Sequence, residues 1–543
     1  MNPTSGGNPT TSKTARRPIG WAAASGIIAA AAFLAAAELV ALIVARSASP
    51  ILAVGSFLID IVPQPVKEFA ISTFGDADKV VLLIGIGFGV VVAAAVAGIL
   101  QYVRPPLGVI ALAIAGILSG AATLTRAGAT PLSVLPPLAG MIVGVLALIL
   151  LINRLRRWRA PRATAPATTT APTTGAPTPA AAADTPASVG RRSFLRASLL
   201  TAAGAVVVGA GSRVVNAATS SLSAIREELA LPAPRTTVTI PDGASFDIPG
   251  LTPLITPNDD FYRVDTALTV PSVDPTTWRL RIDGMVDTPV ELTFDDLVGM
   301  GLDEYAVTLT CVSNEVGGGL VGNAVWLGVP LRDVLRMAGP QAGADMVLSR
   351  SVDGYTASTP LSAVTDDGID AILAVGMNGE PLPFDHGFPV RMVVPGLYGY
   401  VSATKWLTQL TVTTFAQDEA YWTPRGYGAE APIKFSSRID TPRAGTPIPA
   451  GRTPIAGMAW AQTVGIERVE VSIDDGPWQQ ATLSTPINDD TWVQWFLDWD
   501  APGGTHYIAV RAVNRDGETQ IQERAPIAPD GSTGWQRVLV TVR

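Results

Sequence analysis

The single cysteine of this chain is the first residue whose chemistry stands out. Cys311 ends a short apolar–polar alternation, and Asn314 and a run of glycines at 317–319 follow it. Glycines beside a lone thiol indicate a place where a large ligand lies close to the backbone. A single free cysteine is, however, more often a small buried hydrophobic residue. From these residues alone, both interpretations stay open.

Composition excludes several other kinds of site. One cysteine among 543 residues rules out an intramolecular disulfide and a multi-cysteine zinc or iron–sulfur site. The only histidines are His386 and His506, and a net charge of −8 gives no basic field for nucleic acid. The length suggests about three domains. An excess of apolar residues is concentrated before residue 215.

Four long apolar runs in this early part predict membrane-spanning helices. Each is close to the ~20 residues that a helix needs to cross a bilayer. The runs are about Gly20–Val44, Val80–Tyr102, Leu107–Leu124 and Leu132–Leu151. The run Ile51–Val62 is too short to cross and carries Asp60, so we expect it at the membrane interface.

The composition of these runs favours a simple anchor. None contains a histidine, which excludes a b-type haem held between two imidazoles within the spans. Glu38 is the main ionisable residue inside them, and one carboxylate is weak support for an ion or proton route.

The flanking charges predict the orientation of the four-span block, 1–158. Positive residues concentrate on the cytoplasmic side of membrane proteins. One set of flanks carries Lys13, Arg16, Arg17, Arg104, Arg154, Arg156, Arg157 and Arg159. The other set carries fewer cations: Arg46, Lys67, Lys79 and Arg126. Both ends of the block are therefore expected in the cytoplasm.

A linker and an export-like signal follow. Residues 159–189 are mostly alanine, threonine and proline, which lack the apolar side chains needed to fold. Within 190–216, GRRSFLR (190–196) and the uncharged stretch 197–211 resemble a twin-arginine export signal. The resemblance implies that everything after it leaves the cytoplasm already folded. Residues 215–217, VNA, offer a possible cleavage site, but we favour retention of the segment as a fifth span.

The remaining sequence predicts mixed structure followed by strands alone. Trp278–Ile282 and Leu410–Thr414 alternate like half-buried strands. Thr293 is expected to cap one short helix and Pro330 to begin another. From about Ile439 onward, short alternating runs and Asp-Gly turns predict a β-sandwich.

Several segments, taken in order, resemble the sulfite oxidase family of molybdopterin-dependent oxidoreductases. They are TPNDDFYRVDT (256–266), LTCVSNEVGG (309–318), GNAVWLGVPL (322–331), DGYTAS (353–358), HGFPVRMVVPGLYGY (386–400) and KWL (405–407). GIERVEVSIDDGPW (465–478) resembles the family's second, immunoglobulin-like domain. The expected fold is therefore multi-domain: transmembrane helices, an α+β molybdopterin domain at 240–438, and an immunoglobulin-like, dimerisation-type β-sandwich at 439–543.

The resemblance implies a molybdenum–molybdopterin cofactor and a set of residues that hold it. Cys311 falls at the position of the metal ligand, and thiolate is the soft donor that molybdenum favours here. His386 and Arg391 match the pterin-binding stretch, and Lys405 the phosphate-binding lysine, with Ser402 nearby as a backbone donor. Further cofactor contacts are expected from Asp259, Tyr262, Arg263 and Asp353.

Departures from the family pattern affect the predicted substrate. Sulfite-oxidising members place arginines just after the Cys-x-x-Asn segment and just before the Lys-Trp pair. Glu315 follows Asn314 here, and residues 399–402 contain no arginine. A carboxylate near the metal would repel sulfite, and Tyr398 and Tyr400 are expected to line a less cationic catalytic pocket.

The sequence therefore predicts a membrane-anchored, extracytoplasmic oxidoreductase that transfers oxygen atoms. No haem or iron–sulfur cluster is expected in the chain, so electrons would pass to or from a separate cytochrome or quinone system. The C-terminal domain makes a homodimer possible. Two alternatives remain: a reductase of S-oxides or N-oxides such as methionine sulfoxide, and a non-enzymatic membrane-tethered interaction protein with a degenerate cofactor fold.

Overall fold

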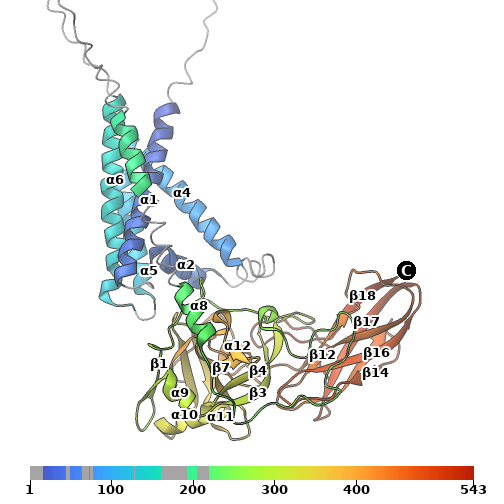
Figure 1. The fold of residues 1–543 in the computed structure, drawn as a ribbon. Helices are drawn as coiled ribbons and strands as arrows, with labels where there is room; N and C mark the ends of the chain where they lie inside the picture. The colour runs from blue at the N-terminus through green and yellow to red at the C-terminus, as the bar shows by residue number, and fades with distance from the viewer. Residues whose placement is uncertain are drawn as a thin grey trace, which may run out of the picture. The chain divides into compact units, whose positions relative to one another are not determined.

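The computed structural model describes residues 16–44, 49–63, 66, 73, 78–126, 129–159, 192–204 and 219–543. The chain divides into two compact units, 1–218 and 219–543. Helices make up the first unit and strands dominate the second (Figure 1). Several predicted features lie outside the described residues: Lys13, Arg46, Lys67, the linker from residue 160 onward, Arg191 and the possible cleavage site at 215–217.

The first unit contains the four predicted long helices. They are α1 (Arg16–Val44), α4 (Asp78–Val103), α5 (Leu107–Leu124) and α6 (Leu135–Arg159), with the short η3 (Pro131–Val134) before α6. Stretches long and apolar enough to cross a membrane are Pro18–Leu42, Val81–Val103, Leu107–Leu124 and Pro131–Trp158. The prediction of four such helices is confirmed, and the fourth extends beyond the predicted Leu151. The apolar α2 (Pro50–Ile61) has only 12 residues, which is too short to span.

Small residues let the helices of this unit approach closely. A β-carbon at Gly26 would collide with the carbonyl oxygen of Ala94, and one at Gly98 with that of Ala22. Backbone contact of this kind is how helices associate in lipid, where apolar burial gives little driving force. A further described helical stretch, 192–204, shares a buried cluster with α1 and α6.

One mixed sheet and one antiparallel sheet form the α+β part of the second unit. The first has the order β2-β1-β10-β5-β6, with only the β1–β10 pair parallel. Its strands are β1 (Arg279–Gly284), β2 (Val290–Thr293), β5 (Met346–Ser351), β6 (Thr356–Pro360) and β10 (Leu407–Thr413). The second has the order β3-β4-β7-β8, with β9 beside β7. Its strands are β3 (Asp303–Thr310), β4 (Val321–Pro330), β7 (Ile372–Met377), β8 (Glu380–Pro381) and β9 (Arg391–Val393).

Short helices cover and connect these sheets. They are α8 (Thr219–Glu228), η4 (Asn258–Asp260), α9 (Phe294–Gly299), α10 (Leu331–Ala338), α11 (Leu361–Thr365), η5 (Phe384–His386), α12 (Gly399–Ser402) and η6 (Thr423–Arg425). Thr293 caps α9, as predicted, because its hydroxyl accepts from the Asp296 N–H at 3.0 Å. Pro330 precedes α10, whose apolar face is buried. Both predicted strands, around 278–282 and 410–414, are confirmed as β1 and β10.

The C-terminal part consists of two four-stranded antiparallel sheets. One has the order β11-β12-β16-β15 and the other β14-β13-β17-β18. Their strands are β11 (Ser436–Thr441), β12 (Gly451–Trp460), β13 (Ile466–Ile473), β14 (Gln479–Gln480), β15 (Thr482–Leu483), β16 (Val493–Ala501), β17 (Gly504–Asn514) and β18 (Gln536–Val542). Side chains from both sheets fill one core, including Trp495 and Val471. The strand-and-turn character predicted after Ile439 is confirmed.

An extended segment, 229–257, ties the α+β part to the C-terminal sheets. Arg235 forms an ion pair with Asp303 of β3. Farther along, the Phe246 ring packs edge-on at 4.9 Å from Phe496 of β16. One strap thus contacts both parts, and the C-terminal part also bonds directly to the loop that carries Cys311.

Candidate functional site

Cys311 lies immediately after β3, at the start of a loop that returns into β4. Its N–H donates to the Leu320 carbonyl at 3.0 Å, and the Asn314 side-chain oxygen accepts from the Leu320 N–H at 2.9 Å. Both bonds brace the loop across its base. The thiol is a free cysteine and only 8% exposed. Burial raises its pKa, so the thiol stays protonated unless a cation or metal stabilises the thiolate.

Three tyrosine hydroxyls lie within electrostatic reach of Cys311. Burial raises the pKa of Tyr262, Tyr355 and Tyr398, and a charge on Cys311 raises each of them further. For Tyr398 the pKa reaches about 12. These hydroxyls are therefore neutral hydrogen-bonding groups at physiological pH, and they line the environment of the thiol.

The short helix α12 and its N-cap position three of the predicted site residues. Tyr398 is its N-cap residue, and the Tyr400 hydroxyl donates to the Gly428 carbonyl at 2.6 Å. Ser402 is fully buried, and its hydroxyl donates back to the carbonyl oxygens of Leu397 and Tyr398. The Ser402 side chain thus stabilises the turn before and within α12.

The predicted basic residues His386, Arg391 and Lys405 lie together in the α+β part. His386 ends η5, and Gly387 follows with φ +110°. A β-carbon at Gly387 would lie 3.1 Å from the β-carbons of both Arg391 and Lys405. Glycine is the residue that tolerates this backbone conformation, and its missing side chain allows the close approach.

Arg391 carries a buried positive charge. It is 5% exposed, and burial lowers its pKa to about 10. Its guanidinium donates to the carbonyl oxygens of His386 (3.1 Å) and Ala403 (3.4 Å) and lies 4.8 Å from the centre of the Trp326 ring. In the described part of the chain, no carboxylate forms an ion pair with it. A buried cation of this kind favours an anionic ligand.

His386 is neutral at physiological pH. Burial and the charge of Arg391 lower its pKa to about 4. The Nε2 atom lies 3.0 Å from the Asn258 carbonyl oxygen, and the ring packs edge-on against Phe261. This bond attaches the stretch that precedes Tyr262 to the basic cluster.

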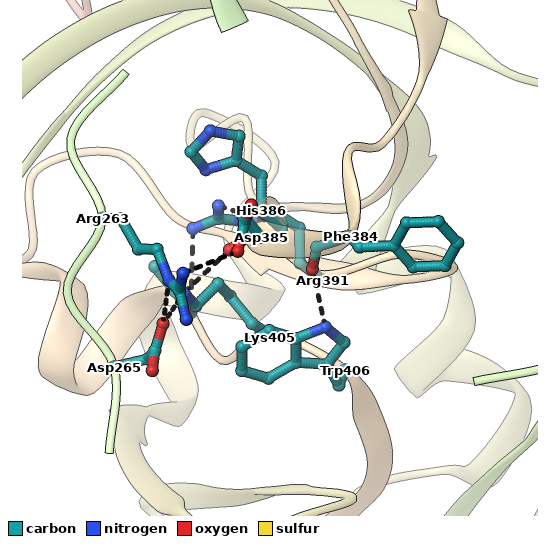
Figure 2. A network of polar contacts seen from close by, with 9 residues as sticks. Arg263, Asp265, Phe384, Asp385, His386, Arg391, Lys405 and Trp406 are labelled. Carbon is teal, nitrogen blue, oxygen red and sulfur yellow. Dashed lines mark hydrogen bonds and ion pairs between the residues drawn. The ribbon is translucent and has the colours of Figure 1, made fainter. Parts of the chain in front are cut away.

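Lys405 sits in a network of charges (Figure 2). Its ammonium donates to the Asp265 carboxylate at 2.8 Å and to the Asp385 carbonyl at 2.9 Å. Arg263 forms ion pairs with both Asp265 (3.0 Å) and the Asp385 side chain (2.8 Å). Burial lowers the pKa of Lys405 to about 8 although Asp265 acts in the opposite direction. The network draws the 261–265 segment onto the 385–405 segment.

The electrostatic contacts join the thiol to the basic cluster. After the larger effect of burial, Cys311 raises the pKa of Tyr262 and Arg391 lowers it. Tyr262 in turn raises the pKa of Arg391, against the larger lowering by burial. Two other predicted residues lie apart from these contacts. Asp259 is exposed, and among the described residues its carboxylate makes no hydrogen bond or ion pair to the cluster. Asp353, also exposed, accepts from the Tyr355 N–H at 3.2 Å, which is ordinary turn chemistry.

The sequence interpretation missed Tyr355. Its hydroxyl donates to the Tyr400 carbonyl at 2.7 Å, which places it beside α12 and within electrostatic reach of Cys311. The residue lies in the DGYTAS segment, two positions after Asp353, so its signal was available in the sequence.

The C-terminal part also contributes to this site. The Ser532 hydroxyl donates to the Asn314 carbonyl at 2.7 Å, and the Gly428 N–H to the Pro529 carbonyl at 3.1 Å. Asp530 raises the pKa of both Tyr398 and Tyr400, after the larger effect of burial. Nothing short-range in the sequence connects this segment to Cys311.

Side chains of both charges meet next to Asn314. Glu315, Lys434 and Tyr398 line one small polar cavity there. Asp530, which acts on Tyr398 and Tyr400, adds a second carboxylate on this side of the loop that carries Cys311.

Comparison with known proteins is consistent with this arrangement. Residues 267–422 match the family described as the oxidoreductase molybdopterin binding domain. The chain is 31% identical to the sulfite oxidase of Gallus gallus, over 52% of this chain and 72% of that protein. The chain belongs to the sulfite oxidase family. This family membership confirms the predicted resemblance and the α+β molybdopterin domain.

Other family relatives match more partially. The chain is 33% identical to mitochondrial sulfite oxidase of Homo sapiens, over 53% of this chain and 62% of that protein. It therefore spans about three-fifths of the human relative. Among solved structures, the sulfane dehydrogenase SoxCD from Paracoccus pantotrophus is 26% identical with a TM-score of 0.48, covering 56% of this chain and 86% of that one.

The described residues fit the molybdopterin group that this family binds. Cys311 offers a soft donor in a buried setting. Arg391 brings a buried charge with no carboxylate partner in the described part, and Lys405 brings an ammonium. A pterin with a phosphate needs both a metal ligand and such cations.

Proposed function

We propose that this protein is a membrane-anchored, extracytoplasmic molybdopterin oxidoreductase in which Cys311 ligates molybdenum. The observation that carries the proposal is the buried Arg391 guanidinium, which has no carboxylate partner in the described part of the chain and lies in the same molybdopterin-binding domain as the buried Cys311 thiol. When bound, the cofactor would supply two-electron oxygen-atom transfer. Family membership favours this enzyme over a non-enzymatic tether.

The chain's own residues would hold and orient the cofactor. Arg391 and neutral His386 would contact the pterin, with Tyr262 and Arg263 from the facing segment. Lys405 would bind the phosphate, supported by backbone N–H groups near Ser402. Tyr398 and Tyr400 would face the substrate as neutral hydrogen-bonding groups. Asp259 and Asp353, being exposed, remain the weakest members of the proposed set.

Metal and pterin content test the proposal directly. Native protein should contain about one molybdenum per chain, and Cys311→Ser should lose most of it, because a hydroxyl is a poor substitute for the soft thiolate. A thermal melt of the metal-free forms serves as the folding control. Native protein without molybdenum, or full molybdenum in Cys311→Ser, would contradict Cys311 ligation.

The membrane arrangement is part of the same proposal. The four long helices would anchor the chain with both ends of the block in the cytoplasm, and the twin-arginine-like segment would direct the catalytic half outward. Protease added to intact spheroplasts should then digest the 219–543 unit and spare the segment after α6. Protection of the catalytic half would reverse the proposed orientation.

The substrate proposal rests on the charges near Cys311. Glu315 and Asp530 disfavour a small dianion such as sulfite, while tyrosine hydroxyls suit a neutral oxygen acceptor or donor. We therefore keep reduction of S-oxides or N-oxides as the second candidate function. Turnover of methionine sulfoxide with a reduced dye, compared with sulfite oxidation under an oxidised dye, distinguishes the two.

Electrons would be exchanged with a separate cytochrome or quinone system, because the sequence offers no haem or iron–sulfur ligand set. A haem absorbance that co-purifies with the single chain would contradict this.

The two C-terminal sheets would form the immunoglobulin-like domain of the family and provide a homodimer interface. The mass of the detergent-solubilised protein tests the homodimer.

A further inference from the structure

The helical stretch 192–204 is anchored within the first unit by one aromatic side chain. Phe194 is 1% exposed and Ala197 is 7% exposed. Both belong to the buried cluster that includes Leu148, Leu151 and Leu155 of α6 and Ala22 of α1. Phe194 and Ala197 are thus packed against α1 and α6.

Two tryptophans enclose the Phe194 ring. Trp21 lies near the start of α1 and packs edge-on, with ring centres 5.7 Å apart. Trp158 lies near the end of α6 and stacks on the ring, also at 5.7 Å. The two tryptophans themselves pack edge-on at 6.1 Å. The result is a three-ring cluster, Trp21–Phe194–Trp158, in which each pair has a favourable aromatic geometry.

The outer face of 192–204 suits lipid. Leu195, Leu199 and Leu200 are 36%, 70% and 72% exposed. Leucine exposed to this degree on one short helix is unfavourable in water and costs little in hydrocarbon. One face is therefore held by the bundle and the other is apolar, as for a helix at the edge of a membrane bundle.

We propose that the four-span block acts as a docking receptor for the chain's own export-signal helix, with Trp21 and Trp158 holding Phe194. The proposal rests on the proposed export function, in which FLR (194–196) belongs to the signal. Docking buries the phenylalanine that the export-signal pattern displays, so docking and recognition by an export receptor exclude one another. The docked state follows transport, keeps the helix in the membrane as a fifth span, and leaves the catalytic half attached.

A cleavable linker provides the test. A specific protease site is inserted within 160–187 of the full chain, which also carries a tag at its N-terminus. The protein is purified in mild detergent and cut. The N-terminal part is captured, and the co-recovered C-terminal part is measured. Docking predicts that most of the C-terminal part stays bound in the otherwise unaltered chain.

Three variants identify the contact. Phe194→Ala and the double variant Trp21→Ala/Trp158→Ala should each reduce the co-recovered fraction by about tenfold, because each removes both aromatic pairs of position 194. Leu200→Ala, an equally apolar truncation on the exposed face, should leave it unchanged. If the double variant fails to fold, Phe194→Ala still tests the contact, because it changes no residue of α1 or α6.

Other outcomes would overturn the proposal. Separation of the two parts in the unaltered sequence shows that the helix is not held. Equal recovery for Phe194→Ala and the unaltered sequence shows that Phe194 does not hold it, and equal loss for Leu200→Ala shows that the effect is not specific. Molybdenum content of the recovered C-terminal part is measured alongside. A failure of the proposed enzyme function would show there, independently of docking.

Discussion

The two ends of the candidate site use different chemistry. Around His386, Arg391 and Lys405, positive charge is buried, and among the described residues the partners of Arg391 are carbonyl groups and an aromatic ring. Around Cys311, the polar groups are tyrosine hydroxyls with high pKa values, and the nearby charges are mainly acidic. We refer to these as the basic end and the tyrosine end.

The difference separates cofactor binding from substrate selection. A buried cation is stable only if an anion or a set of dipoles compensates it, so the basic end is suited to a resident phosphate-bearing group. Neutral hydroxyls impose a smaller desolvation cost when a substrate arrives and leaves. In the proposed function, the buried positive charge would thus serve the cofactor, whereas a sulfite-binding pocket would need more of it at the tyrosine end as well.

The largest expected effect comes from neutralising the basic end. Arg391→Gln should lower cofactor retention by about 100-fold, the scale expected when one partner of a buried charge pair is removed. Pterin and molybdenum content measure the effect. Arg452→Gln, at an arginine whose side chain is 78% exposed, and Tyr400→Phe at the tyrosine end should both retain normal content. A similar loss in Tyr400→Phe would remove the distinction between the ends.

Two substitutions at the Lys405–Asp265 ion pair should have smaller effects on cofactor retention, and the two effects should differ. Lys405→Met removes the proposed phosphate contact and should weaken cofactor retention by about 10- to 100-fold. Asp265→Asn removes the carboxylate 2.8 Å from the ammonium, so retention should stay equal or improve. Reconstitution of the metal-free protein with extracted cofactor gives both values. Weakening by Asp265→Asn as large as that by Lys405→Met would mean that the pair matters only as structure.

The basic end was more predictable from sequence than the tyrosine end. His386, Arg391 and Lys405 fall within one stretch, and Arg391 stands out because it interrupts an apolar run. Short-range signals also gave the Thr293 cap, the α10 start and the four apolar helices, since capping and hydrophobic runs depend on neighbouring residues.

The tyrosine end depends on contacts that no local pattern carries. The bond from Ser532 to Asn314 joins residues 218 positions apart, and Asp530 arrives with the same segment. The strap at 229–257 makes that approach possible, and its irregular backbone has no periodicity to detect. Tyr355 was missed for a different reason. The adjacent Asp353-Gly354 pair is most simply interpreted as a turn, which gives no functional reason to single out the next residue.

Charge reversal at the tyrosine end should have a moderate effect. Glu315→Arg should lower the KM or inhibition constant for a small anion such as sulfite by about 3- to 10-fold at low salt, and less at high salt, because exposed charges are screened. Steady-state kinetics at two ionic strengths measure this. Glu523→Arg, at another exposed carboxylate, should change it much less. Unchanged anion binding in Glu315→Arg would remove Glu315 from the proposed selection of substrate.

The smallest expected effect concerns pH and the neutral state of His386. Its pKa is about 4 in the folded protein against about 6.5 when unfolded. Between these values the unfolded chain binds more protons, so this residue makes the free energy of unfolding fall as pH drops from 6.5 toward 4.

Asp490 acts in the opposite direction over part of the same range. Burial raises its pKa to about 6, so it binds a proton in the folded state first and favours folding as pH falls. Comparing His386→Gln with the unaltered protein isolates the histidine, since Asp490 is common to both. Thermal melts from pH 4 to 7 should show a shallower loss of Tm on acidification in His386→Gln. Parallel curves would mean that His386 takes up its proton equally in the folded and unfolded states, and that the basic end tolerates a third positive charge.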